Sequence, residues 1–307
     1  MRRPSLAELE TRCQKADYRR IGNWMARRVA RPLALRVTWI VLPWGISAHA
    51  VTLVAFLTGL AAAAGFAQGG IGGWLLGAAL LQLWYLLDHV DGQLARYHGT
   101  ASLDGVALDY LMHHVLGLCL PLGIGYGLFA GSFEPLWLLA GVAWGVGTLG
   151  IGLVNDVRYK AFIQRLKIVD GQLEVVGGGG ARSLPAPAVP RSLRPLASWL
   201  ARKLCEPHVA MNLLGAVALF AWLVEDTRLW LGCVYVAGMA LLAPVVASVQ
   251  LLRSLRQGAT ESEFKAWFRV PDDTALTYRG DRWVAEKQPT PAMVDRDTPA
   301  PAPDRRG

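Results

Sequence analysis

The chain has 307 residues, of which 53% are hydrophobic and only 18% are charged, whereas soluble domains average about 25% charged residues. Its 33 glycines and 12 tryptophans are typical of a membrane protein, because Gly is frequent in membrane helices and Trp at membrane interfaces. The four cysteines are far apart and form no Cys-x-x-Cys pair, which argues against a zinc site and against a disulfide framework.

Residues 1–46 are basic and amphipathic. Arginines such as Arg27 and Arg28 alternate with apolar residues such as Trp24 and Val29. The segment has no early apolar run of the kind that a signal peptide carries. We predict an amphipathic interfacial helix on an anionic membrane surface; a solvated basic arm is the alternative.

Six apolar runs follow, and a helix needs about 20 apolar residues to cross the bilayer core. They cover residues 47–68, 71–87, 103–130, 136–154, 209–224 and 229–252, and the second runs on as a helix to Tyr97. The fifth run is the shortest. The predicted fold is therefore an all-α integral membrane protein with six transmembrane helices, which form a domain over residues 47–257.

Two segments outside the apolar runs are predicted to be irregular. The segment of about 166–205 contains four consecutive glycines from Gly177 and several prolines, which predicts a loop. Residues 258–307 form a polar tail with one aromatic-bearing piece over 264–283, and its Pro-rich end is predicted to be disordered.

The basic residues indicate the topology. If the N-terminus is cytoplasmic, six crossings leave every Lys and Arg except Arg228 on the cytoplasmic side. The opposite side then carries Glu134, Glu225 and Asp226. Positive residues favour the cytoplasmic side, so both termini and the long loop are predicted to be cytoplasmic, in a bacterial inner or cell membrane. Topology thus explains the net charge of +8, and no nucleic-acid partner is expected.

Ionisable residues cluster where the second predicted helix ends and the third begins. Asp88 and Asp91 share one face of the second helix, and Asp109 and His113 share one face of the third. The turn between them is short, so the three carboxylates can converge. Like charges in a low dielectric repel unless a cation joins them, and hard oxygen ligands suit Mg²⁺ or Mn²⁺. With Arg96 beside it, such an ion would neutralise a diphosphate and stabilise a leaving phosphate.

The stretch from Asp88 to His113 resembles the signature of the CDP-alcohol phosphotransferase family, D-x2-D-G-x2-A-R-x8-G-x3-D-x3-D, at seven of its eight fixed positions. Residues 46–52 resemble, more weakly, the start of the family's first helix. The resemblance implies that a CDP-linked lipid donor, usually CDP-diacylglycerol, gives its phosphatidyl group to a small alcohol and releases CMP in phospholipid biosynthesis. It also allows a homodimer.

The resemblance implies a role for each matched residue. Asp88, Asp91 and Asp109 would hold the metal, and Gly92, Ala95, Arg96 and Gly105 would shape the CDP site. His113 stands where the family usually has Asp, the proposed general base. A neutral imidazole can accept a proton from an alcohol, so activity with His113 as the base is expected; a different metal count, an unusual acceptor or lost activity are the alternatives.

Several further polar residues have simpler roles in this interpretation. Thr52 and Arg158 are candidate substrate contacts, although a positively charged cytoplasmic flank explains Arg158 equally well. Asp104 is expected in the first turn of the third helix with Ser102 as the N-cap. His114 is predicted to be a packing residue. Interhelical hydrogen bonds are expected from Gln82, Asn212 and Gln250.

Three other functions fit a membrane chain with acidic residues. A cation transporter would hold its carboxylates near the midplane and often has two related halves, but here they cluster at one face without an internal repeat. Prenyltransferases usually carry two Asp-rich motifs, and this chain has one. A catalytically inactive relative would keep the motif without turnover. The acceptor alcohol cannot be read from the sequence.

Overall fold

The computed structural model describes residues 3–14, 18–19, 22–170, 173–175, 190, 192–269, 274–279 and 282–287. The chain divides into two compact units. The first comprises Met1–Asp156 with Ala181–Arg256, and the second comprises Val157–Gly180 with Gln257–Gly307. Helices dominate the described residues, and the strands among them are no longer than 6 residues. The predicted all-α class is confirmed.

Within the described residues, five helices are long and apolar enough to span a membrane. They are α3 (Ala48–Ala67), α4 (Gly70–His98), α5 (Leu103–Ser132), α6 (Leu136–Lys167) and α9 (Trp230–Arg256). A sixth span is complete only if α7 (Leu193–Leu204) and α8 (Pro207–Leu223), which are bent by 71° at their junction, count as one. Pro207 starts α8 and lacks the N–H that would continue the preceding helix.

The structure adds regular elements where the sequence predicted loop and tail. Helix α6 runs to Lys167, well past the predicted end at residue 154. The predicted loop of 166–205 contains α7 and the short strands β1 (Val169–Asp170) and β2 (Glu174–Val175). The rest of that Gly/Pro-rich loop lies outside the described residues, as does the chain after Lys287, so the predicted disorder of the tail end remains a prediction.

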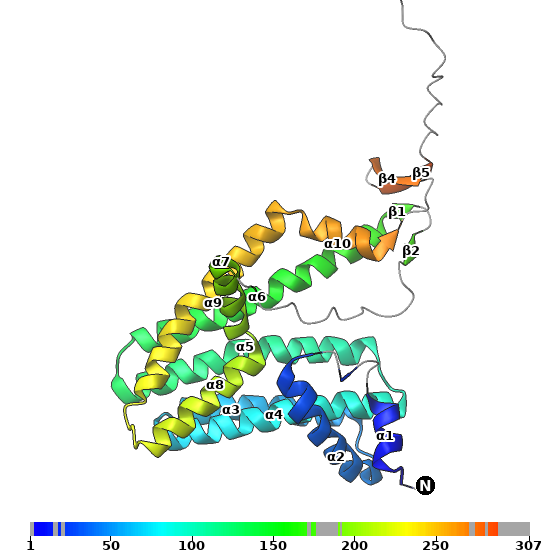
Figure 1. The fold of residues 1–307 in the computed structure, drawn as a ribbon. Helices are drawn as coiled ribbons and strands as arrows, with labels where there is room; N and C mark the ends of the chain where they lie inside the picture. Colours follow the sequence, from blue (N-terminus) through cyan, green and yellow to red (C-terminus); the bar gives the residue numbers. More distant parts are fainter. Residues whose placement is uncertain are drawn as a thin grey trace, which may run out of the picture. The chain divides into compact units, whose positions relative to one another are not determined.

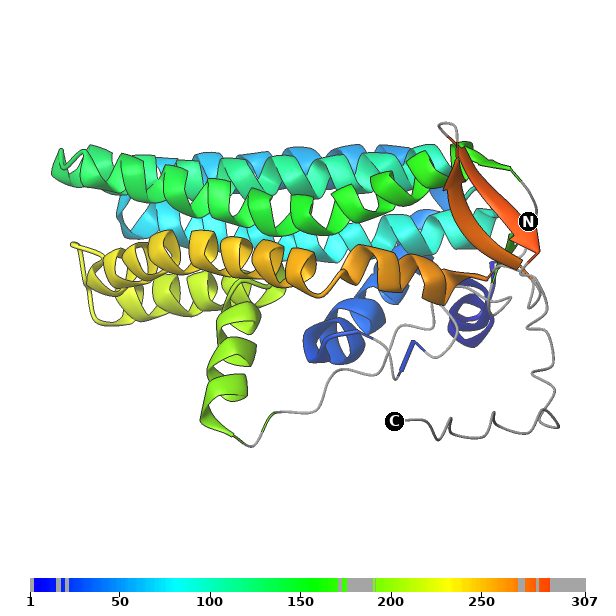
Figure 2. The same ribbon diagram turned by 90° about the horizontal axis from the view of Figure 1, so that it is seen from above.

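Small residues let the first three spanning helices approach closely. A Cβ on Gly65 of α3 would lie 3.0 Å from the backbone nitrogen of Gly77 on α4, and one on Gly123 of α5 would collide with the carbonyl oxygen of Ala63 on α3. Figures 1 and 2 both show α3, α4 and α5 running alongside one another. Membrane helices associate through such small-residue contacts because lipid offers no hydrophobic driving force. Trp74 on α4 is fully buried, and its ring packs edge-on against Phe66 of α3 with centroids 5.5 Å apart.

The basic N-terminal arm forms two short helices, not one. Helix α1 (Leu6–Cys13) starts with a capping box between Ser5 and Glu8. Helix α2 (Arg31–Val41) follows a π-helical turn, and both helices pack against α4 (Figure 1). Trp24 and Trp44 are about two-thirds exposed on this arm, at 66% and 69%. The arm is amphipathic as expected; its position at a membrane surface remains a prediction.

The second unit has a small aromatic core of its own. It combines the end of α6 with α10 (Ala259–Trp267) and the strands β3 (Phe268–Arg269), β4 (Thr274–Arg279) and β5 (Arg282–Lys287). Phe162 and Phe264 are buried against each other, with ring centroids 5.4 Å apart. Strand β5 pairs with β4 antiparallel and with β1 parallel. The predicted polar tail is therefore folded over part of its length.

Candidate functional site

The turn between α4 and α5 sets the geometry of the acidic residues. Helix α4 ends at Gly99, whose φ of 65° is left-handed and therefore suits glycine. Helix α5 begins after Ser102, whose hydroxyl accepts a hydrogen bond from the Gly105 N–H at 3.1 Å. Asp104 lies in the first turn. The predicted N-cap and helix start are confirmed, and the short turn brings the two acidic helix ends together.

His113 joins the acidic residues of the two helices. Its Nε2 lies 3.2 Å from Asp88 Oδ1 and 3.3 Å from Asp109 Oδ1. One ligand atom from each of these three side chains lies within 4.8 Å of the others, as a shared metal ion requires. The Trp84 ring stands edge-on to the imidazole, with centroids 5.4 Å apart. His113 is thus held by packing on one side and by two carboxylates on the other.

Asp91 has a different partner. Its Oδ2 accepts a hydrogen bond of 2.7 Å from the Thr52 hydroxyl on α3. Thr52 Oγ1 also lies 3.1 Å from the carbonyl oxygen of Ala48, one turn earlier. Thr52 was predicted to contact substrate, and in the structure its hydroxyl orients the Asp91 carboxylate. Among the described residues, Asp91 is not a member of the compact group formed by Asp88, Asp109 and His113.

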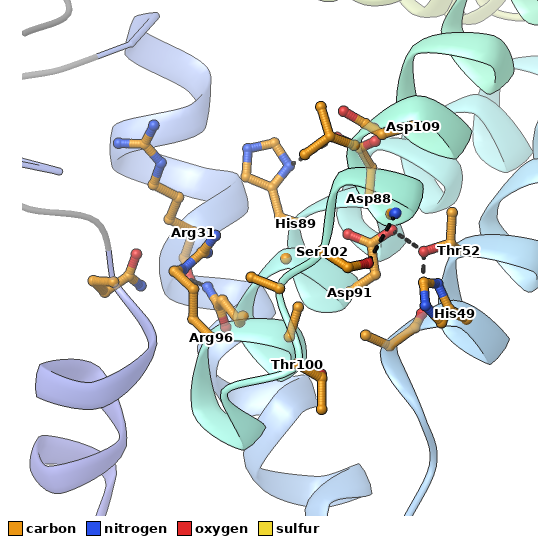
Figure 3. Close-up of a pocket in the computed structure, with 18 residues that line it drawn as sticks. Arg31, His49, Thr52, Asp88, His89, Asp91, Arg96, Thr100, Ser102 and Asp109 are labelled. Carbon is orange, nitrogen blue, oxygen red and sulfur yellow. Dashed lines mark hydrogen bonds and ion pairs between the residues drawn. The ribbon is translucent and has the colours of Figure 1, made fainter. Parts of the chain in front are cut away.

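A cavity of about 320 Å³ opens over these residues (Figure 3). All seven residues that the sequence assigned to the metal and CDP sites line it, namely Asp88, Asp91, Gly92, Ala95, Arg96, Gly105 and Asp109. Thr52 lines it as well. His113 is not among the lining residues and reaches the cavity only through its two carboxylate partners.

Arg96 is oriented by the N-terminal arm. Its Nε donates a hydrogen bond to the carbonyl oxygen of Cys13, at the end of α1. A Cβ on Gly92 would lie 3.2 Å from Arg96 Nη1, so the glycine leaves room for the guanidinium one turn away. This gives a local reason for the Gly and the Arg at this spacing. The motif predicted Arg96, but not that the arm fixes it.

The cavity also includes residues that the sequence analysis did not assign to the site. Arg31 on α2, Gln14 after α1, and His49 and His89 all line it. His89 Nδ1 lies 2.9 Å from the Tyr85 carbonyl oxygen. His49 lies within residues 46–52 and His89 lies within the signature of residues 88–113, so their positions in the sequence could have indicated that they line the site. Arg31 lies far from the motif along the chain, and only folding brings it to the cavity.

Three predicted roles for polar residues can be compared with their contacts. His114 packs against Gly152 of α6, as predicted, and its Nε2 also lies 2.9 Å from Asp156 Oδ2 on the same helix. The interhelical hydrogen bonds are confirmed, from Gln82 to Asn212 at 3.2 Å and from Gln250 to Asn155 at 2.9 Å. Within the second unit, Arg158 Nη1 lies 3.4 Å from Glu263 Oε2. Its contact with a substrate remains a prediction.

The residues present fit a hard divalent cation. Asp88, Asp109 and His113 are all half-buried, and one ligand atom of each lies within 4.8 Å of the others. The carboxylate of Asp91 lines the same cavity. Carboxylate oxygens are the preferred ligands of Mg²⁺ and Mn²⁺, and imidazole is compatible with Mn²⁺. The fold and the site together define a class: integral membrane proteins with an acidic, arginine-flanked cavity suited to phosphate-group chemistry.

Comparison with known proteins identifies the family. Residues 41–167 match the family model described as CDP-alcohol phosphatidyltransferase. The match covers α3, α4, α5 and α6, including the whole acidic cluster. The resemblance stated from the motif is thus confirmed. No curated protein sequence matched the chain.

Solved structures to which this chain is similar include phosphatidylinositol phosphate synthase (PgsA1) of Mycobacterium tuberculosis. The form with CDP-DAG bound is 19% identical, with a TM-score of 0.47, over 75% of this chain and 92% of that chain. The form in complex with manganese and citrate is also 19% identical, with a TM-score of 0.48, over 82% of this chain and 97% of that chain.

Proposed function

We propose that this protein is a membrane enzyme that transfers a substituted phosphate group from a CDP-linked alcohol, such as CDP-diacylglycerol, to an alcohol acceptor. CMP is the second product, and the reaction belongs to phospholipid biosynthesis. The observation that carries the proposal is the cavity itself. Seven residues of the family signature line one space, with carboxylates and a guanidinium both facing it.

Each signature residue has a task in this reaction. Asp88, Asp91 and Asp109 would hold Mg²⁺ or Mn²⁺, with Thr52 fixing the orientation of the Asp91 carboxylate. The bound ion would supply positive charge for the donor's diphosphate and the departing CMP. Arg96 adds a second positive charge beside the phosphates.

His113 is the proposed general base. Its Nε2 lies against Asp88 and Asp109, and these two carboxylates line the cavity. A neutral imidazole at this position takes the proton of the acceptor hydroxyl as its oxygen attacks phosphorus, and the phosphate–CMP bond breaks. A transporter is less well supported, since the charged residues of the site gather at the helix ends that the turn at Gly99 connects.

The setting of the enzyme follows the distribution of charge. We place both termini and the active site on the cytoplasmic side of a bacterial inner or cell membrane, because the basic residues flank that side of the spans. The acceptor is a small alcohol of unspecified structure. A homodimer is proposed on the family resemblance alone.

The test is CMP release by the purified full-length protein in detergent micelles. With CDP-diacylglycerol and Mn²⁺, CMP should appear only when a suitable alcohol from a panel is added, with a matching lipid product. Asp91→Asn should lower the rate at least 100-fold, since it removes a carboxylate of the proposed metal site.

Asp104→Asn provides the matched control. Asp104 is exposed in the first turn of α5 and does not line the cavity, so its variant should keep the wild-type rate. Wild-type protein that releases no CMP with any alcohol, or an Asp91→Asn variant with unchanged turnover, would contradict the proposal.

A further inference from the structure

A second arginine, outside the family signature, lines the same cavity. Arg31 is the first residue of α2 in the basic arm, and its side chain is half-buried. It lines the cavity together with Arg96. In Figure 3, Arg31 and Arg96 lie on one side of the view, and Asp91 and Asp109 lie on the other. The cavity thus has a basic wall and an acidic wall.

The backbone of Arg31 is fastened to the helix that carries the signature. Its carbonyl oxygen accepts a hydrogen bond of 3.2 Å from Gln93 Nε2 on α4. Gln93 Oε1 in turn accepts a hydrogen bond of 2.9 Å from the Thr38 hydroxyl, further along α2. Gln93 and Thr38 are both buried, at 1% and 0% exposure. Because Gln93 follows Asp91 by two residues, this connection fixes the start of α2 beside the acidic residues.

Nearby backbone also fixes the position of the Arg31 guanidinium. One of its terminal nitrogens, Nη1, donates a hydrogen bond to the Tyr18 carbonyl oxygen. A Cβ on Gly22, which has a φ of 93°, would lie 2.9 Å from the other, Nη2. Burial lowers the pKa of the Arg31 guanidinium, Tyr85 opposes that shift and Arg27 adds to it. The fold therefore holds the Arg31 side chain at the cavity, where its planar N–H donors suit phosphate oxygens.

We propose that Arg31 binds the diphosphate of the cytidine nucleotide donor, together with Arg96 and opposite the carboxylates. This inference rests on the proposed function. Three carboxylates alone would repel a diphosphate, and Arg96 already gives its Nε–H to Cys13. A second planar fork of N–H donors suits phosphate oxygens. Arg31 is thus a binding residue that the basic arm adds to the transmembrane signature.

The experiment measures ligand affinity and needs no turnover. Titration calorimetry on the full-length protein in detergent micelles with Mn²⁺ would compare CDP with cytidine. Arg31→Gln should weaken CDP binding about tenfold, a loss of about 1.4 kcal/mol, and leave cytidine affinity within about twofold. Arg31→Lys, which keeps the charge but not the fork, should fall between wild type and Arg31→Gln.

Arg28→Gln is the matched control, since Arg28 is an exposed arginine of the same arm that does not line the cavity. It should bind CDP as wild type does. If wild-type protein binds no CDP, the proposed function fails. If wild type binds CDP and Arg31→Gln binds it equally well, as when Arg31 serves an acceptor's phosphate, the inference about Arg31 fails and the proposed function stands.

Loss of folding is distinguished by the same titrations. An Arg31→Gln variant that loses CDP and cytidine affinity to the same degree overturns the inference, because the arm then acts through shape and not through a phosphate contact. If Arg31→Gln has no melting transition, Arg31→Lys decides. Weaker CDP binding with unchanged cytidine binding supports the inference, and wild-type CDP affinity overturns it.

Discussion

At the scale of single residues, the substitution of His for Asp at position 113 is the main departure from the family signature. The sequence shows the departure but not its surroundings. In the structure, Nε2 of His113 is within 3.3 Å of both Asp88 and Asp109. The imidazole can therefore serve either as a proton acceptor or as a nitrogen ligand of the metal, and these two roles leave different kinetic traces.

We expect His113→Ala to lower the rate of CMP release by roughly 10²–10⁴-fold, the usual contribution of a general base. His113→Asp should retain most of the activity, because a carboxylate restores the family's usual proton acceptor. The measurement is steady-state CMP release at several Mn²⁺ concentrations. If His113 is the base, His113→Ala lowers kcat at every Mn²⁺ concentration. If the full activity of His113→Ala returns at high Mn²⁺, His113 is a metal ligand instead.

At the scale of elements, the connection between the basic arm and α4 depends on one buried pair. Gln93 links the Arg31 carbonyl to the Thr38 hydroxyl, and both partners lie on α2. Neither side chain could be assigned this role from the sequence, since the two positions are 55 residues apart. A buried hydroxyl that loses its partner carries a larger penalty than a pair removed together.

Gln93→Leu should therefore destabilise the attachment of the arm by about 1–3 kcal/mol. The expected signs are a lower melting temperature and faster tryptic cleavage within residues 19–36, where arginines are frequent. The double variant Gln93→Leu with Thr38→Val should recover part of the loss, because no buried polar group is then left unpaired. A single variant as stable and as protease-resistant as wild type would show that other contacts hold the arm.

The difference between local patterns and contacts of distant segments explains what the sequence could and could not predict. The spanning helices follow from apolar length, and the acidic site follows from i, i+3 and i+4 spacing on two helices joined by a short turn. Both signals are local. The end of α6 at Lys167, the pairing of Asp91 with Thr52 and the presence of Arg31 at the cavity depend on contacts between distant segments. Periodicity carries no information about those.

At the scale of the whole molecule, the orientation in the membrane is the main expectation. Both the proposed function and the role of the basic arm require the cavity to face the compartment that contains cytidine nucleotides. Basic residues on one side of the spans favour that side's retention in the cytoplasm. In the structure, α8 and α9 are joined by a short connection that includes Thr227, whereas Ser262 lies on α10 after the last spanning helix.

Cysteine labelling in intact cells tests this orientation directly. In a background with Cys13, Cys119, Cys205 and Cys233 replaced, Thr227→Cys should react with a membrane-impermeant maleimide added outside. Ser262→Cys should react only after the cells are permeabilised. Both side chains are exposed in the structure, so failure to label reports on the membrane and not on burial. The unsubstituted Cys-free protein sets the background. Labelling of Ser262→Cys in intact cells would show the opposite topology. The cavity would then face the side that lacks nucleotide donors, which contradicts the proposed function.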